Sequence, residues 1–227
     1  MLTEKQQALL DVAEAKARNR LAPLGTGAER VDEKLLAALA EHGLLGRLFR
    51  REGDGYARVS AMTLCLLREG LARHCTEAET ALALQGLGSY PILLAGSPQL
   101  IARWIPEVAA GRIAAGFALT EPDAGSDAAA LRTRAEKVAG GWRLSGQKMW
   151  ISLGNVAELA LVFAQTAPER KHKGLACFLV PTGSAGFSAQ EIHGKLGLRA
   201  SDTAALALDG VEVPDDALLG EVGDGFK

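Results

Sequence analysis

Two stretches of the chain combine hydroxyl and aromatic residues in a way that could hold a flat ring with hydrogen-bonding edges. They are Phe117-Ala-Leu-Thr-Glu-Pro-Asp-Ala-Gly-Ser-Asp127 and Lys148-Met-Trp-Ile-Ser152. The hydroxyls of Thr120 and Ser152 can donate and accept hydrogen bonds, and the indole of Trp150 can cover a ring face. The isoalloxazine ring of a flavin needs such hydroxyls, nearby backbone amides and an aromatic wall. A flavin site is therefore one hypothesis for these residues.

The turn that ends the first stretch could meet a phosphate. Gly125 lets the backbone approach closely, and Ser126 adds a hydroxyl donor. Glu121 and Asp127 are negative, so we expect them to hold the turn by hydrogen bonds instead. A plainer interpretation stays open here, and composition alone favours it: an ordinary polar turn, with Trp150 as a core aromatic.

The composition limits the class of protein. The 227 residues are 48% hydrophobic and 23% charged, as is typical of soluble globular proteins. A formal net charge of -2, with no Lys/Arg-rich run, argues against nucleic-acid binding. The apolar runs are shorter than the roughly 20 residues of a membrane span, and the N-terminus has no apolar signal region. We expect a cytoplasmic protein without membrane or nucleic-acid partners.

The cysteines and histidines show no metal-binding or catalytic spacing. Three cysteines cannot all pair internally, so we expect free thiols in a reducing compartment and no metal site. The cysteines are Cys65, Cys75 and Cys177.

The first half of the sequence has helical periodicity. Leucines recur at intervals of three and four residues, for example over residues 35–45. Thr76, followed by Glu79, is a candidate N-cap, and Ser97-Pro98 is a second candidate helix start. We expect an all-α N-terminal helical domain over residues 1–113.

The second half has the pattern of short strands. Residues 131–136 alternate uncharged and charged, Ala139-Gly-Gly141 is a turn signal, and residues 159–163 and 176–180 are short apolar runs. No long helical pattern intervenes. We therefore predict an α+β chain in which residues 114–227 form a small antiparallel β-barrel domain.

Several motifs resemble those of the acyl-CoA dehydrogenase family, in the same order. The two stretches above resemble its flavin motifs, and Lys195-Leu-Gly-Leu-Arg-Ala-Ser-Asp-Thr203 is similar to a loop of its middle domain. The close, from Val211-Glu-Val-Pro214 to Gly-Phe-Lys227, resembles the exit from that domain, and Gly96-Ser-Pro-Gln resembles the start of the last N-terminal helix. The resemblance covers essentially the whole chain.

The resemblance implies FAD as the cofactor and a role for eight residues in binding it. Ser126 would also lie near the acyl-CoA, and the Ser152 hydroxyl would reach N5, the flavin atom that receives hydride. The implied FAD contacts are Phe117, Leu119, Thr120, Gly125, Ser126, Trp150, Ile151 and Ser152.

The reaction implied by the resemblance is oxidation of an acyl-CoA thioester to the 2,3-enoyl-CoA. Electrons would pass to an electron-transferring flavoprotein. The general base of relatives lies in a C-terminal helical domain beyond Lys227, so no catalytic residue is assigned here. We expect the isolated chain to bind FAD weakly and to be inactive without that domain.

Two other segments match regions that bind substrate in relatives. Gln85 and Tyr90 fall where relatives line the distal acyl pocket, and they could shorten or polarise it; core packing is an equal alternative. Lys171 or Lys173 could approach the CoA phosphates, although a solvated loop is the plainer interpretation.

Two alternatives to a dehydrogenase stay open. One is a non-catalytic or complementing subunit that binds a flavin or CoA together with a separate helical partner. The other keeps the fold but is an acyl-CoA oxidase or a flavin monooxygenase. We expect either a homo-oligomer or a complementing helical domain as the partner, and the acyl chain and the electron acceptor stay unassigned.

Overall fold

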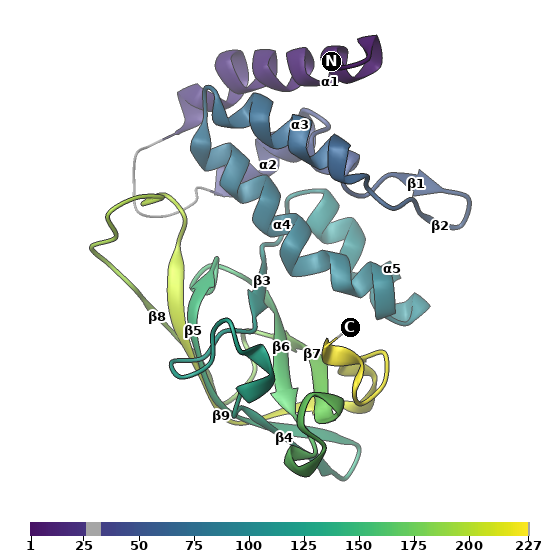
Figure 1. Ribbon diagram of the computed structural model, residues 1–227, viewed down its shortest axis with the longest axis vertical. Coiled ribbons are helices and arrows are strands. Elements are labelled where there is room, and N and C mark those ends of the chain that lie inside the picture. The colour runs from purple at the N-terminus through teal and green to yellow at the C-terminus, as the bar shows by residue number, and fades with distance from the viewer. Residues whose placement is uncertain (26–32, 227) are drawn as a thin grey trace.

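The computed structural model of the protein describes residues 1–25 and 33–226, so Lys227 of the closing motif lies outside the described residues. The N-terminal part is helical and packs against one side of a sheet formed by the C-terminal part (Figure 1). Helices α4 and α5 lie between α1–α3 and the strands. The α-helices are α1 (Glu4–Lys16), α2 (Glu33–Glu41), α3 (Ala61–Ala72), α4 (Thr76–Ala95) and α5 (Pro98–Ala109).

The strands after α5 form one sheet in the order β10-β7-β6-β4-β5-β9-β8, with β3 paired to β6. Most neighbours are antiparallel, as the hairpin β4–β5 illustrates. The strands are β3 (Ala115–Ala118), β4 (Arg134–Val138), β5 (Gly141–Ser152), β6 (Leu159–Gln165), β7 (Leu175–Pro181), β8 (Phe187–Glu191), β9 (Thr203–Pro214) and β10 (Leu218–Leu219).

Strand β6 is buried on both faces, which explains its uninterrupted apolar sequence. One set of alternate side chains, Leu159, Leu161 and Phe163, belongs to a core shared with the helices. The other set includes Ala160 and Val162, which pack in a second core among the strands. The helices and the sheet therefore share one continuous core rather than meeting at a polar boundary.

Helix α4 anchors β3 at the point where the chain enters the sheet. The Nε2 atom of buried Gln85 donates to the Ile113 carbonyl at 2.8 Å, and the Ala115 amide donates to Oε1 of Gln85 at 3.0 Å. Gly88 permits the close approach, because a Cβ there would lie 2.2 Å from the Ala115 carbonyl oxygen. These contacts fix the position of the segment that follows β3.

The expected helical domain followed by a β domain is confirmed. The Ser97-Pro98 helix start is also confirmed: the Leu100 amide donates to the Ser97 hydroxyl at 3.3 Å, and Pro98 is the first helical residue. Gly140 has φ 76° in the β4–β5 turn, a left-handed conformation that favours glycine.

Three details differ from the sequence expectations. The helical half contains a small hairpin of β1 (Arg51–Glu52) and β2 (Gly55–Tyr56). The predicted Thr76 cap is wrong, because Thr76 is already helical and Cys75 precedes it without a side-chain cap. Strand β3 runs parallel to β6, a pairing set by the contacts of β3 with α4 rather than by a local turn.

No helix among residues 1–25 and 33–226 combines the length and apolar character needed to cross a bilayer.

Candidate functional site

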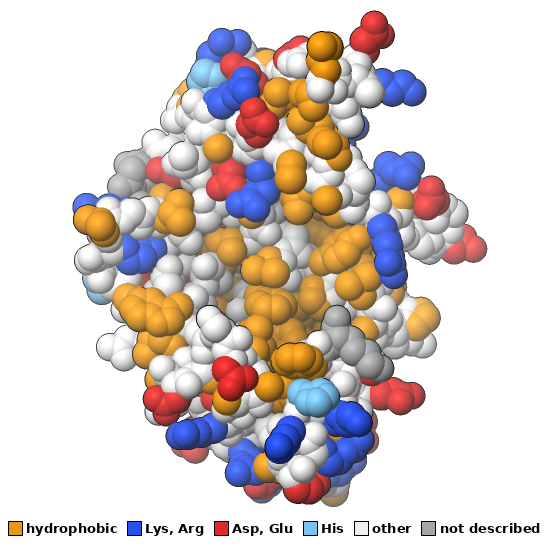
Figure 2. All heavy atoms as spheres, in the orientation of Figure 1, with side chains coloured by type: hydrophobic (Ala, Val, Ile, Leu, Met, Phe, Trp, Pro, Cys, Tyr) orange, Lys and Arg blue, Asp and Glu red, His pale blue; other side chains and the backbone are white. Residues whose placement is uncertain are grey.

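A small cavity lies between α4 and the edge of the sheet, with a volume of about 160 Å³. Figure 2 shows apolar side chains gathered in a hollow in the middle of the displayed face, between the helices and the strands. The volume is below the roughly 300–1,000 Å³ of enclosed ligand pockets, so a larger ligand would extend onto the open surface. The lining residues are Leu84, Leu87, Ala115, Phe117, Thr120, Trp150, Ile151 and Ser152.

The backbone turns Trp150 out of the sheet and toward solvent. Trp150 has φ 61°, in the left-handed region that is uncommon for a bulky residue, and the pairing of β5 with β9 shifts register between Lys148 and Ile151. The side chain is 61% exposed. Because strain of this kind gathers at functional sites, the bulge is a candidate device for presenting an indole. The core-aromatic interpretation of Trp150 is wrong.

A buried ion pair joins the two predicted stretches. The Lys148 ammonium donates to the Glu121 carboxylate at 2.8 Å and to the Leu119 carbonyl at 3.1 Å. The other donors to Glu121 are the backbone amides of Arg132, at 2.6 Å, and Thr133, at 2.9 Å. The Lys148 side chain is fully buried and that of Glu121 is 6% exposed. The expectation that Glu121 holds the turn is confirmed.

Burial and hydrogen bonding act in opposite directions on the pair. Burial alone would raise the pKa of the Glu121 carboxyl, but the hydrogen bonds from Lys148, Thr133 and Arg132 outweigh it and lower that pKa below its ordinary value. Burial lowers the pKa of the Lys148 ammonium, and the nearby Glu121 only partly offsets this effect. We treat the pair as ionised because three donors surround the carboxylate.

A backbone hydrogen bond brings the two stretches together beside the cavity. The Met149 amide donates to the Thr120 carbonyl at 2.9 Å, directly before the left-handed Trp150. On the other side of Trp150, Leu153 also has a left-handed backbone, with φ 59°. Its amide donates to the Asp202 carbonyl at 2.8 Å, which ties the end of β5 to the start of β9. The strained segment is therefore fixed at both ends.

The structure brings together five of the eight residues that the sequence assigned to a flavin. Leu119 contributes its carbonyl to the Lys148 ammonium instead of lining the cavity. Gly125 and Ser126 are exposed on the turn beyond Glu121, and nothing lies within 4 Å of a Cβ built on Gly125. Open backbone of this kind can receive a phosphate. The five residues that share the cavity are Phe117, Thr120, Trp150, Ile151 and Ser152.

These residues suit a flavin ring in chemistry and placement. The cavity offers two hydroxyls, from Thr120 and Ser152, and the phenyl ring of Phe117. The indole of Trp150 is aimed outward rather than into a core. A ring that is apolar at one end and hydrogen-bonding along an edge matches this set.

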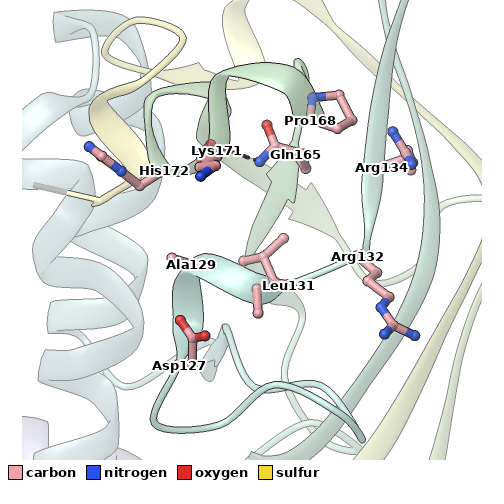
Figure 3. Close-up of a pocket in the computed structure, with 10 residues that line it drawn as sticks. Asp127, Ala129, Leu131, Arg132, Arg134, Gln165, Pro168, Lys171 and His172 are labelled. Atoms are coloured by element: carbon pink, nitrogen blue, oxygen red, sulfur yellow. Dashed lines mark hydrogen bonds between the residues drawn. The ribbon is translucent and has the colours of Figure 1, made fainter.

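A second concavity, of about 400 Å³ and with basic residues in its lining, begins at Asp127, directly after the turn of Gly125 and Ser126. Lys171 and His172 line it from the segment between β6 and β7, Arg132 from the segment before β4, and Arg134 from the start of β4 (Figure 3). Asp127 is the acidic residue of the lining. Positive side chains grouped around a hollow can bind phosphate.

Sequence reasoning missed the contribution of α4 to the cavity. Leu84 and Leu87 line it opposite the sheet residues. The residues singled out instead, Gln85 and Tyr90, have structural roles: Gln85 anchors β3, and the Tyr90 hydroxyl accepts from the Val59 amide at 3.2 Å. The three-residue spacing of Leu84 and Leu87, one face of a helix, was the available signal.

Comparison with known proteins gives the family of both halves. The profile "Acyl-CoA dehydrogenase, N-terminal domain" matches residues 3–112, and "Acyl-CoA dehydrogenase, middle domain" matches residues 116–211.

Individual relatives match nearly the whole chain. An acyl-CoA dehydrogenase of Bacillus subtilis is 34% identical over 99% of this chain and 60% of its own length. A cyclohexane-1-carbonyl-CoA dehydrogenase of Geobacter metallireducens is also 34% identical, with the same two coverages. The crystal structure of a glutaryl-CoA dehydrogenase from Mycobacterium smegmatis, in complex with FADH2, is 36% identical with a TM-score of 0.86. It covers 96% of this chain and 56% of that one. This chain spans about 60% of the length of the two sequence relatives.

Proposed function

This chain belongs to the acyl-CoA dehydrogenase family, and we propose that it forms the flavin-binding part of an FAD-dependent acyl-CoA dehydrogenase. The proposed reaction is oxidation of an acyl-CoA thioester to the 2,3-enoyl-CoA. The proposed domains are a helical one over residues 1–113 and a flavin-binding one over residues 114–227.

The observation that carries the proposal is the left-handed, outward-facing Trp150 beside the Thr120 and Ser152 hydroxyls. A protein that needed only a stable sheet would gain by an extended backbone at this position, since strained residues cost about 1–3 kcal/mol. The bulge presents an aromatic face next to two hydroxyls, and that combination suits a flavin.

When bound, FAD would supply the acceptor for the hydride that leaves C3 of the acyl group. The residues of this chain would hold the ring: Trp150 against one face, with Phe117 and Ile151 beside it. The Thr120 and Ser152 hydroxyls would donate along its polar edge. The buried Glu121–Lys148 pair lies behind this surface and would keep the two stretches in register.

The phosphates of the ligands have two proposed places. The open turn at Gly125 and Ser126 would meet the FAD pyrophosphate, with Ser126 also near the acyl-CoA. The basic concavity around Lys171 and Arg132 suits the phosphates of CoA, because three cationic side chains, Lys171, Arg132 and Arg134, line it.

We propose that part of the site comes from outside the described residues. No carboxylate lines the cavity among residues 1–25 and 33–226, so we propose that a further helical segment supplies the general base. Leu87 and Trp150 are 49% and 61% exposed, a surface that such a segment or a second copy of the chain could cover. An electron-transferring flavoprotein is the proposed acceptor of the electrons.

FAD titration of the purified protein tests the proposal. Tryptophan fluorescence should be quenched as FAD binds, and Trp150→Leu should weaken FAD affinity roughly 10-fold or more by removing the stacking surface. Met62→Leu is the control, since Met62 is a large apolar side chain on α3, 47% exposed and outside the cavity lining. Unchanged affinity in Trp150→Leu would contradict the proposed site.

The second reading, a complementing subunit without activity of its own, predicts a different result. In that case a separate helical protein would co-purify with the chain and restore both FAD retention and acyl-CoA oxidation. Oxygen consumption by the reduced flavoprotein would favour the oxidase or monooxygenase reading instead.

A further inference from the structure

Helix α4 presents an unbroken aliphatic surface to the cavity. Leu84 and Leu87 are three residues apart, so they project from the same face of the helix, and both line the cavity opposite Trp150. Leu87 is 49% exposed. The same face continues one and two turns further on with Pro91 and with Leu94, which is 55% exposed. An acyl group that leaves the cavity along α4 would meet only apolar side chains on this face.

The polar side chains in this part of α4 are engaged in contacts within the fold. Gln85 is fully buried, with its amide nitrogen and oxygen bonded to the backbone on either side of Ala114. The Ser89 hydroxyl donates to the Gln85 carbonyl. The Tyr90 hydroxyl accepts from the Val59 amide. The contacts of Gln85 and Tyr90 join α4 to the rest of the fold, whereas the Ser89 contact lies within the helix.

The part of this face that borders the cavity also lacks charged side chains, although Glu77 lies on the same face two turns before Leu84. None of the described residues that line the cavity is charged. The acidic residues of α4, Glu77 and Glu79, lie in its first turn, and Glu79 pairs with Arg68 at 2.5 Å. Arg112, which lies between α5 and β3, forms a two-pronged contact with Glu107 at 2.6 and 2.7 Å.

Because this surface lies next to the proposed flavin site, it limits which acyl groups the substrate can carry. Hydride transfer needs the reacting carbons close to the ring, so the rest of the acyl group must continue onto a surface next to the ring. Among the described residues, α4 is the helix that borders the cavity. Where the proposed further segment covers this surface, a carboxylate at the far end of the acyl group would lose water and gain no partner from the apolar face of α4, which is unfavourable.

We infer that Leu84 and Leu87 determine acyl specificity, and that the site accepts an uncharged aliphatic or alicyclic acyl group and rejects one that ends in a carboxylate. The inference rests on the proposed function. It separates this chain from the relative whose structure is that of a glutaryl-CoA dehydrogenase, although the two are 36% identical. The wall of the site, rather than overall similarity, decides the substrate.

Two CoA thioesters with five acyl carbons, pentanoyl-CoA and glutaryl-CoA, provide a matched pair that differs in the terminal carboxylate. Their 3-thia analogues have sulfur in place of C3 and cannot lose hydride, so equilibrium binding can be measured on the FAD-loaded protein by calorimetry. We expect the pentanoyl analogue to bind at least about 100-fold more tightly than the glutaryl analogue.

A charge placed on the wall should change this preference. Leu87→Arg offers a guanidinium to the carboxylate, and the pentanoyl-to-glutaryl affinity ratio should fall at least about 10-fold. Met62→Arg adds the same charge to a side chain of similar exposure on α3 and should leave the ratio unchanged. Leu87→Gln, which adds a hydrogen-bonding group without charge, serves if Leu87→Arg loses its FAD, and should lower the ratio less.

The outcomes separate the inference from the proposed function. Equal or tighter binding of the glutaryl analogue by the unmodified protein would overturn the inference and leave the acyl-CoA site intact. An unchanged ratio in a Leu87 variant that retains FAD would overturn it as well. Failure of both analogues to bind the FAD-loaded protein would overturn the proposed function, and the inference with it.

Discussion

The two walls of the cavity are built on different principles. On the sheet side, Trp150 and Leu153 have left-handed backbones, and a buried ion pair lies directly behind them. On the helix side, Leu84 and Leu87 belong to a regular helix whose polar residues serve the fold. On the sheet wall, a strained backbone and a buried ion pair fix the positions of the side chains. The helix wall supplies only shape and apolar surface. This contrast suggests a fixed ring-binding side and an adaptable side that sets specificity.

Removal of the buried carboxylate should have the largest effect on this contrast. Glu121→Gln leaves the Lys148 ammonium buried without its counter-ion, and we expect a loss of about 3–5 kcal/mol of unfolding free energy, measured by denaturant titration. The double variant Glu121→Gln/Lys148→Met should recover much of this loss, since it removes both charges. A stability loss below about 1 kcal/mol in Glu121→Gln would show that the pair does not hold the sheet wall.

The same pair predicts acid sensitivity. The folded-state pKa of Glu121 is lowered, so its contribution to stability is present above the ordinary carboxyl value of 4.5 and is lost as pH falls below it through the folded pKa. The melting temperature of the unmodified protein should therefore fall more steeply below pH 4.5 than that of the double variant Glu121→Gln/Lys148→Met. Parallel curves would indicate that other carboxylates govern the acid transition.

Alanine substitutions at two glycines of α4 test how closely the helix wall packs against β3. Gly88→Ala places a methyl group 2.2 Å from the Ala115 carbonyl, and we expect a loss of about 1–3 kcal/mol as α4 and β3 move apart. Gly86→Ala is the control in the same helix, because its nearest neighbour is a flexible leucine methyl group at 3.4 Å. That variant should be neutral or slightly stabilising, by up to about 1 kcal/mol. Chemical denaturation of both variants measures the difference.

Relief of strain at Trp150 should have the smallest effect on stability. Trp150→Gly suits a left-handed backbone, and we expect a stability change within about 1 kcal/mol, together with at least about 10-fold weaker FAD binding. Leu87→Ala, on the helix wall, should leave FAD affinity nearly unchanged. Equal losses of FAD affinity in the two variants would remove the distinction between the walls.

Local pattern predicted much of the chain, because the features in question depend on neighbours in sequence. The Ser97-Pro98 start of α5 depends on the bonding of the first turn, and the turn at Gly140 on a backbone that favours glycine. The apolar runs in β6 and β7 follow from burial on both faces. The two site stretches were also visible in sequence, since a glycine, hydroxyls and a tryptophan are grouped there.

Other features depend on distant contacts and could not be predicted from local pattern. Thr76 carries a capping side chain, yet it lies one residue inside the helix, because the preceding Cys75 packs in the core. Gln85 looked like a pocket residue, but the return of the chain at Ile113 and Ala115 places it in a structural joint. The parallel pairing of β3 with β6 has the same origin.

The amino-acid sequence by itself determined the order of helices and strands and the residue types that can meet a ring and a phosphate. Periodicity, caps and turns act over a few residues, so they can be inferred without a structure. The tertiary structure alone decided that Lys148 is buried against Glu121, that Trp150 faces outward, and that α4 closes the other side. Those outcomes depend on desolvation and packing between segments that are far apart in the chain, and they become defined only once the core has formed.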